Sequence, residues 1–296
     1  MCTSLLGRCL VLALVLLSAG CSSLTALNAS VPDDGFVVSR GHAFGTLPRQ
    51  QLDVYVPRNL SGPAPVVVFF YGGAWQHGRR GDYKFVGEAL TSKGFVVVIP
   101  DYRLYPEVKF PAFLEDGGAA VAWTQREIGR FGGDPHRIFL MGHSAGAYNA
   151  AMVALDAHYV EAAGGRHADV IGFIGLAGPY DIRPDTSIIL DSIFGVTPDL
   201  RLAQPANFVE TDSPRALLLY AEHDTTVLPV HSRRLARRFR AVSGRVTEVS
   251  YPDLGHASIV GVLAKPYQGR APVLEEVTRF ITSGDTQFAS SPLSVK

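Results

Sequence analysis

Short runs of apolar residues recur along the chain, separated by longer stretches of mixed character. Five runs are continuous: VVVFF (66–70), FVVVIP (95–100), RIFLM (137–141), VIGFIGL (170–176) and ALLLY (216–220). Continuous apolar runs of this length are typical of parallel strands covered on both faces of a sheet. QLDVYVP (51–57) alternates instead, which indicates a half-buried edge strand.

The stretches between these runs have helical character. Residues 81–94 end in Gly94, which suits a helix C-cap, and residues 111–129 begin with Pro111, which is favoured in a first helical turn. This alternation predicts βαβ crossovers and a doubly wound, mostly parallel α/β sheet. Residues 177–214 lack a strand pattern, and we expect a small cap-like insertion over the carboxyl edge of the sheet, where ligands bind in open α/β folds.

One further predicted helix, 230–242, is strongly basic. Leu235, Phe239 and Val242 recur at helical spacing and predict its buried stripe. Its other side carries four arginines: Arg233, Arg234, Arg237 and Arg238. A solvated face is the simpler interpretation of these arginines, and contact with anionic lipid headgroups is the alternative.

Composition narrows the classes of function. The chain has 296 residues, of which 47% are hydrophobic, enough for one large α/β domain. Lys+Arg and Asp+Glu both number 27, so the formal net charge is +0. Without a basic run interleaved with aromatic residues, nothing favours a nucleic-acid partner.

The N-terminus resembles a bacterial lipoprotein signal. Arg8 precedes an apolar stretch, CLVLALVLLSAG, which has the length of a signal-peptide core and is short for a membrane span. Small residues then lead directly into Cys21. We expect residues 1–20 to be a signal peptide, Cys21 to be lipidated, 21–35 to form a polar tether and 36–296 to form the folded domain. A plain secretory signal is the alternative.

The cysteines agree with this interpretation. Cys2, Cys9 and Cys21 are the three cysteines of the chain, so the body after Cys21 contains no thiol for a disulfide. Ser22 follows Cys21, where an inner-membrane retention signal typically has aspartate. We therefore expect a cell-envelope protein, held by Cys21 to the outer membrane and facing the periplasm.

A nucleophile elbow is the strongest chemical signal. The sequence GHSAG (142–146) follows an apolar run and precedes good helix material, AYNAAMVALDAHYV. G-x-S-x-G between a strand and a helix presents the serine hydroxyl above the sheet on a sharp turn. Ser144 is thus the candidate nucleophile. A glycine-rich turn with an incidental serine is the alternative.

A serine nucleophile needs a general base, and the base needs an orienting carboxylate, in the chain order serine, acid, histidine. Asp224 follows the run ALLLY and is the candidate acid, with Glu222 and Asp253 as alternatives. His256 lies on a glycine-flanked loop after the predicted strand RVTEVSY. Chain order excludes the histidines before the acid, His223 adjoins Asp224, and His231 lies in the basic helix. His256 is therefore the candidate base.

Acyl transfer also needs N–H donors for the negative charge on the carbonyl oxygen. One donor in this arrangement is the amide after the nucleophile, that of Ala145, and the other comes from the loop after the third strand. Gly72 and Gly73, in YGGAW (71–75), occupy that loop. A tight turn is the simpler interpretation of this glycine pair.

Together these residues resemble the α/β-hydrolase superfamily, and within it the carboxylesterase branch of feruloyl-esterase-like and kynurenine-formamidase-like enzymes. The resemblance runs from about Val54 to His256 through YGGAW, DYRLYPEVKFPAFLEDGGAAVAW, FGGDPHRI, GHSAG and GPYD. It implies an α/β-hydrolase fold without cofactor or metal. It also implies a catalytic set of Ser144, His256 and Asp224, with oxyanion donors Gly72, Gly73 and Ala145.

The resemblance suggests further roles around this site. Tyr71 stands where the family usually has histidine, which makes the loop geometry a question for the structure. Asp101, Asp116 and Asp134 are expected to brace loops. Candidates for the substrate pocket are Tyr71, Trp75, His143 and Tyr180.

We therefore expect a serine carboxylesterase that acts on a small-molecule ester with small to medium acyl groups through an acyl-enzyme. An arylformamidase-type amide hydrolase would use the same groups, although the leader argues against a cytosolic pathway. A non-catalytic envelope binding protein on a hydrolase fold is the alternative from another class.

Overall fold

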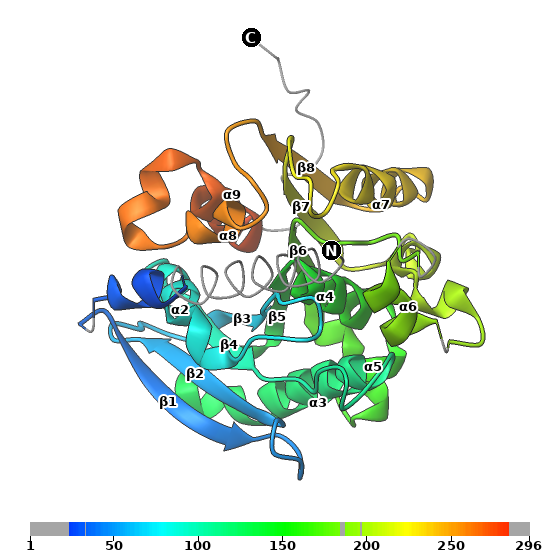
Figure 1. Ribbon diagram of the computed structural model, residues 1–296. Coiled ribbons are helices and arrows are strands. Elements are labelled where there is room, and N and C mark those ends of the chain that lie inside the picture. The colour runs from blue at the N-terminus through cyan, green and yellow to red at the C-terminus, as the bar shows by residue number, and fades with distance from the viewer. Residues whose placement is uncertain (1–23, 33, 184–186, 196, 284–296) are drawn as a thin grey trace, which may run out of the picture.

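A computed structural model describes residues 24–32, 34–183, 187–195 and 197–283. The expected signal peptide, 1–20, and the expected lipidation site, Cys21, lie outside the described residues. Within them, residues 36–283 form one sheet with helices packed on both of its faces (Figure 1).

Eight strands of the described chain form the sheet, in the spatial order β1-β2-β4-β3-β5-β6-β7-β8. Strands β3 to β8 run parallel to one another, whereas β2 is antiparallel to both β1 and β4. The strands are β1 (Phe36–Ala43), β2 (Gln51–Pro57), β3 (Ala64–Phe70), β4 (Val96–Pro100), β5 (Gly133–His143), β6 (Val170–Leu176), β7 (Arg215–Ala221) and β8 (Val246–Tyr251). The α/β-hydrolase fold that the sequence predicts is confirmed.

The edge position predicted for residues 51–57 is wrong, because β1 covers that side of β2. Strand β1 has mixed burial, and its register shifts between Ser39 and His42. Its sequence, FVVSRGHA, therefore lacks the continuous apolar run and the regular alternation by which the other strands are recognised.

Helices cover both faces of the sheet (Figure 1). On one face α2 (Lys84–Thr91) contacts β2, β4 and α9 (Val273–Thr282), with α8 (Ser258–Gly261) nearby. On the other, α4 (Ala145–Leu155) contacts β5, β6, α3 (Ala112–Glu127) and α5 (His158–Ala162), and α7 (Val230–Ala241) packs on β7 and β8. Short 3-10 helices join these elements: η1 (Arg80–Tyr83), η2 (Ile128–Phe131), η3 (His167–Asp169) and η7 (Lys265–Arg270).

The stretch 177–214 contains no strand among its described residues, and its helical elements are α6 (Ile188–Phe194), η5 (Leu200–Ala203) and η6 (Pro205–Phe208). Ile193 and Phe194 of α6 are buried against the domain, while Ile188 at its start is 90% exposed. The side chain of Gln204 donates to the carbonyl of Ile182 and accepts from its amide, at 2.7 and 2.9 Å. The insertion is thus fastened to the domain at several points.

The basic helix forms as predicted, with Leu235 and Phe239 of α7 buried. Three of its arginines bind neighbouring segments of the domain. Arg233 pairs with Glu222 at 2.6 Å, and Arg234 pairs with Asp181. Arg238 donates to the carbonyls of Ala206 and Val209, so much of the positive charge on this helix serves to hold the insertion and the adjacent loop.

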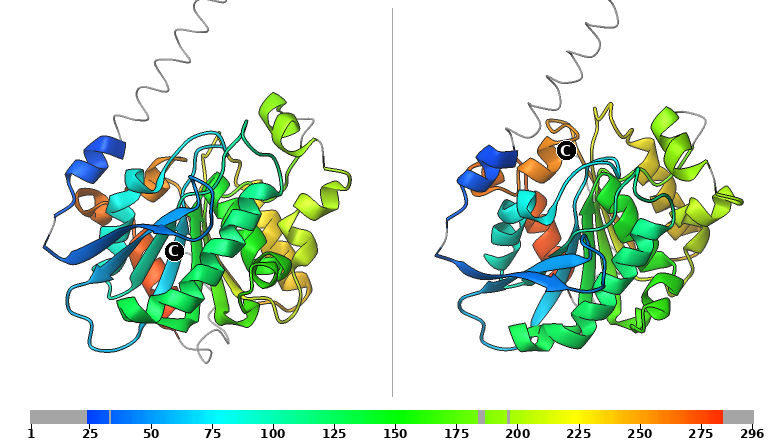
Figure 2. Two further views of the ribbon diagram at one scale, coloured as in Figure 1. Left: turned by 90° about the horizontal axis from the view of Figure 1, so that it is seen from below. Right: turned by 60° about the horizontal axis from the view of Figure 1, so that its bottom comes forward.

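The start of the described chain differs from the tether expected over 21–35. Residues 24–29 are helical, and Leu24 and Leu27 pack against the core. The side chain of Asn28 donates to the carbonyl of Gly81 and accepts from the amide of Phe85. Figure 2 shows this dark-blue helix at the left of the molecule and the yellow-green segment of α6 at its right. No helix of the described chain is long and apolar enough to cross a bilayer.

The order of the strands creates a switch point beside the centre of the sheet. From β3 the chain crosses to β4 on one side, and from β5 it continues to β6, β7 and β8 on the other. Loops that leave the carboxyl ends of β3 and β5 therefore diverge, which opens a crevice at that edge. The loop 71–75 and Ser144 follow these two strands.

Candidate active site

Ser144 lies on a sharp turn between β5 and α4, with φ 55° and ψ −125°. Glycines flank it because the turn is crowded. A Cβ on Gly142 would overlap the backbone of Gly146, and a Cβ on Gly146 would overlap the carbonyls of Phe70 and Tyr71. The Ser144 amide donates to the carbonyl of Leu176 on β6 at 2.9 Å, which fixes the turn above the sheet.

The structure brings the three candidate catalytic side chains together. His256 Nε2 lies 2.9 Å from Ser144 Oγ, and His256 Nδ1 lies 2.7 Å from Asp224 Oδ2. All three lie on loops that follow strands: β5 for Ser144, β7 for Asp224 and β8 for His256. A proton can pass from the hydroxyl to the imidazole, while the carboxylate holds the other ring nitrogen.

Asp224 is held as an acceptor. Its side chain is fully buried, and its Oδ1 accepts the amides of Thr226 and Val227 at 2.8 and 2.9 Å. The two alternative acids lie elsewhere, because Glu222 pairs with Arg233 and Asp253 is exposed. Of the three acids considered from the sequence, Asp224 is the one whose carboxylate reaches His256.

His143, predicted as a pocket residue, instead braces the loop of His256. Its Nε2 lies 2.8 Å from the carbonyl of His256, and the two rings are 4.9 Å apart. Because a carbonyl only accepts, Nε2 carries the proton. Burial lowers the pKa of His143 to about 3, with repulsion from His256 as the next cause. The ring is therefore neutral, and its buried Nδ1 has no partner among the described residues.

The loop after β3 has an unusual backbone. Gly73, Ala74 and Trp75 have φ values of 130°, 51° and 57°, a region that alanine and tryptophan rarely adopt. This conformation turns the loop back toward Ser144, and Ala74 lies beside Ser144 and Ala145 in the wall of one pocket. Gly73 must be glycine, because a Cβ there would overlap the carbonyl of His77.

Gly72 lies outside the wall of the pocket that Ser144 and Ala145 line. Burial raises the pKa of Tyr83 to about 12, and the amide of Gly72 opposes this shift by hydrogen bonding to the phenol. Gly72 itself is buried. Ala74 is exposed and lines that pocket. The sequence held no signal for Ala74, because the direction of its amide depends on a positive φ that is rare for alanine.

Tyr71 is fully buried and braces the loop, so its prediction as a pocket residue is wrong. Its hydroxyl donates to Asp101 Oδ1 at 3.0 Å and accepts from Arg49 Nη2 at 2.8 Å. Its ring stacks between those of Tyr83 and Tyr102. Tyrosine therefore fills the position with an aromatic stack and a charged hydrogen-bond network.

The other expected braces are also in place. Asp101 binds Arg80 as well as Tyr71. Asp116 binds Arg103 at 2.9 Å, and Asp134 accepts the amide of His136. These carboxylates order the loops around the site, and none of them reaches Ser144.

A pocket of about 620 Å³ opens beside Ser144 and Ala145. Trp75 lines it, with its Nε1 donating to Asn149 Oδ1 at 2.9 Å and its ring edge-on to Phe194 of α6. Apolar residues supply much of the wall, which also includes Ile182, Leu190, Val227, Leu228 and Val230. Tyr180, another predicted pocket residue, is buried against Gly175 and Gly178 and does not line this pocket.

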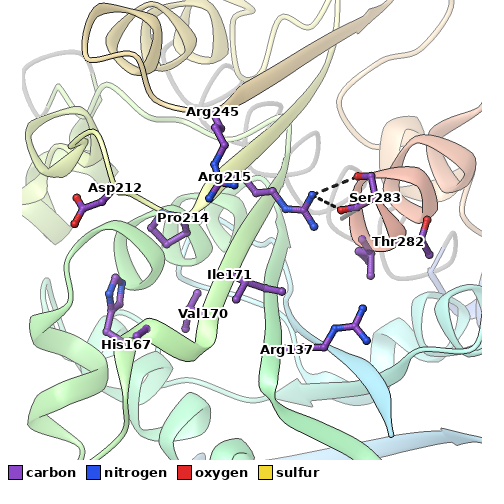
Figure 3. A pocket seen from close by; sticks show the side chains of 12 residues that line it. Arg137, His167, Val170, Ile171, Asp212, Pro214, Arg215, Arg245, Thr282 and Ser283 are labelled. Carbon is purple, nitrogen blue, oxygen red and sulfur yellow. Dashed lines mark hydrogen bonds between the residues drawn. The ribbon is translucent and has the colours of Figure 1, made fainter. Parts of the chain in front are cut away.

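A second, basic cavity of about 410 Å³ lies at the opposite edge of the sheet (Figure 3). Arg137, Arg215 and Arg245 line it, and Arg215 donates to the carbonyl and hydroxyl of Ser283. Its lining includes Val170 and Arg215 at the amino ends of β6 and β7, whereas Ser144 follows the carboxyl end of β5, so the cavity lies far from the Ser144 loop. Among the described residues there is no cluster of three side chains able to hold a metal ion.

Known proteins that are similar to the chain include esterases. Residues 52–239 match the BD-FAE family. A probable isoprenylcysteine alpha-carbonyl methylesterase of Oryza sativa subsp. japonica is 35% identical over 281 residues, which are 87% of this chain and 66% of the relative. The esterase LipC of Mycobacterium tuberculosis is 30% identical over 241 residues, covering 75% of this chain and 60% of the relative. The chain thus spans less than two thirds of the length of these curated relatives.

The fold is also that of solved esterase structures. Inhibited esterase B from Lactobacillus rhamnosis superposes with a TM-score of 0.79 at 21% identity, over 92% of this chain and 95% of that one. At this identity the likeness concerns the fold.

Proposed function

The chain belongs to the BD-FAE family of α/β-hydrolases, and from that premise we propose that it is a carboxylic ester hydrolase with Ser144 as its nucleophile. The observation that carries the proposal is the continuous hydrogen-bonded chain from Asp224 through His256 to Ser144, with links of 2.7 and 2.9 Å. The esterase names of the relatives agree with it.

In the proposed reaction, His256 Nε2 accepts the hydroxyl proton of Ser144 as Oγ attacks the ester carbonyl. Collapse of the tetrahedral intermediate expels the alcohol, which takes that proton from His256, and leaves an acyl-enzyme. Water then attacks the acyl carbon with His256 as base, and the acid is released as the acyl bond to Ser144 Oγ breaks and Oγ takes the proton back from His256. Asp224, fixed by two backbone amides, stabilises the imidazolium that forms twice in this cycle.

The negative charge on the carbonyl oxygen is received by backbone amides. We assign this role to Gly73, Ala74 and Ala145, since Ala74 and Ala145 line the pocket beside Ser144 whereas Gly72 is buried outside its wall. Loss of a single donor of this kind lowers kcat by about 10²- to 10³-fold. Because the donors are part of the backbone, their positions depend on the braces described above, above all on the buried Tyr71.

For the substrate, we propose esters with small to medium acyl groups, bound in the largely apolar pocket beside Ser144. Methyl esters deserve inclusion among the tested compounds because of the methylesterase relative. A formamidase-type reaction would use the same groups, and a panel containing aryl formamides and acylated sugars as well as simple esters separates the two substrate classes.

The nucleophile can be identified directly by covalent labelling. A p-nitrophenyl alkylphosphonate should phosphonylate the protein once, and peptide mass spectrometry should locate the label on Ser144. His256→Ala should react much more slowly, because the hydroxyl then lacks its base. A label on any other residue, or no label in a folded protein, would refute the proposed nucleophile and favour a binding protein.

We further propose that the protein is anchored in a bacterial cell envelope through lipidated Cys21, at the outer membrane facing the periplasm. The support for this proposal is the leader of residues 1–20 and the absence of any cysteine after residue 21. The helix 24–29, which begins only a few residues after Cys21, would then hold the domain close to the membrane surface.

A further inference from the structure

A third cavity, of about 530 Å³, lies behind the loop of His256. We name it the rear pocket. The helix 24–29 forms one wall with Leu24, Ala26 and Leu27, and α8 with its flanking residues forms another. Its lining shares no residue with the pocket beside Ser144. The rear pocket is therefore a separate compartment, within the usual volume range of a small-ligand site of about 300–1,000 Å³.

The chemistry of the rear pocket is that of an amphiphile site. Apolar side chains form most of its walls, including Leu24, Leu27, Val260 and Val262. The single charged residue among the lining side chains is Arg270, which is exposed. Within the described chain Arg270 has no carboxylate partner. Tyr267 beside it is 43% exposed.

From this arrangement we propose that the rear pocket binds a single-chain anionic amphiphile, such as a medium-chain carboxylate, with the alkyl chain between helix 24–29 and α8 and the head group on Arg270. The apolar walls favour the chain, and the unpaired guanidinium favours an anion over a neutral head group. A carboxylate of this kind is also the acid that an ester hydrolase releases, but the proposed site is distinct from the Ser144 pocket.

The inner end of the rear pocket reaches two side chains that brace the candidate active site. His143 holds the carbonyl of His256 at 2.8 Å, and the ring of Tyr83 stacks on that of Tyr71 in the loop after β3. A ligand in the rear pocket would touch both braces. Its binding should therefore change kcat for a short ester without the rise in KM that competition at Ser144 would cause.

The test is a calorimetric titration of the full chain, in detergent-free buffer, with decanoate and with 1-decanol. Gly261→Leu places a side chain in open space, where a Cβ would lie 3.9 Å from Leu27, and so fills the pocket. Arg270→Gln removes the charge alone. Leu190→Trp, which narrows the Ser144 pocket instead, is the matched control.

We expect one decanoate to bind per chain, about tenfold or more weakly after Gly261→Leu, and about three- to tenfold more weakly after Arg270→Gln. Decanol binding should be unaffected by Arg270→Gln, and decanoate binding should survive Leu190→Trp. If circular dichroism shows that Gly261→Leu is unfolded, the test rests on Arg270→Gln alone. In that variant the affinity for decanoate should fall while the affinity for decanol stays the same. The proposal is overturned if decanoate does not bind, if it binds only when incorporated in vesicles, or if Leu190→Trp alone abolishes binding.

Discussion

His143 illustrates how burial fixes the state of a single residue next to the proposed base. The sequence places it directly before Ser144, and chain order excludes it as the base. The structure shows a neutral ring that donates to the carbonyl of His256. His143 is thus a positioning residue, which acts through the loop that carries His256.

This residue should give the protein an acid-sensitive stability. The pKa of His143 is about 3 in the folded state, well below the ordinary histidine value near 6.5. Between these pH values the unfolded chain binds a proton that the folded chain does not. The contribution of His143 to the free energy of unfolding should therefore be fully present above pH 6.5. It should decrease as the pH falls below that value, by up to about 1.4 kcal/mol per pH unit.

The measurement is urea unfolding of the wild type and of His143→Gln between pH 7 and pH 4. Glutamine retains an N–H donor for the carbonyl but does not titrate, so its stability should depend less steeply on pH. Parallel curves for the two proteins would show that His143 is not held neutral by the fold.

At this scale, side-chain identity and chain order predicted most of what the structure places in the site. Ser144, Asp224 and His256 lie within hydrogen-bond reach because each follows a strand whose end the apolar runs marked. That Ala74 rather than Gly72 lines the pocket beside Ser144 could not be predicted, because it depends on the φ values of the loop after β3. Tyr180 was misplaced for a similar reason, since the direction of its ring depends on the packing of Gly175 and Gly178.

Among the elements, the turn from β5 to α4 tolerates the least change. Gly146 packs against the carbonyls that end β3, and backbone atoms cannot move aside as a side-chain tip can. We expect Gly146→Ala to destabilise the protein by about 1–3 kcal/mol and to lower kcat by shifting Ser144. Gly129→Ala is the control, because a Cβ there meets no atom within 4 Å.

Thermal unfolding and ester turnover of these two variants provide the comparison. Gly129→Ala should resemble the wild type in both measurements. Equal stability and activity for Gly146→Ala would mean that the elbow is looser than its contacts indicate.

Elements were predictable where the hydrophobic pattern was strong. Seven strands and the helices α2, α3, α4 and α7 fall close to their expected ranges. Strand β1 was not predicted, because buried and exposed residues are mixed along it at the sheet edge. The helix 24–29 was not predicted, because its small and polar residues suit a tether. Tertiary contacts of Leu27 and Asn28 stabilise it, rather than its own helix propensity.

At the scale of the whole molecule, the proposed anchor and the docked helix act together. Leu24 follows Cys21 by three positions, which span at most about 10 Å when extended, so an acylated Cys21 would keep the domain near the membrane. Cys21→Ser should move the protein from the membrane fraction to the soluble periplasmic fraction without loss of ester hydrolysis. Metabolic labelling with a fatty acid should mark the wild type and not the variant. An unchanged fractionation would refute anchoring through Cys21.

The central claim is that Ser144 carries out ester hydrolysis. Its most direct test is kcat/KM for p-nitrophenyl acetate, measured on the purified wild type and on Ser144→Ala, with folding of both checked by circular dichroism. Since the nucleophile acts as a unit with its base, we predict a fall of about 10⁴-fold or more in the variant. A folded Ser144→Ala protein that keeps a rate close to that of the wild type would contradict the account.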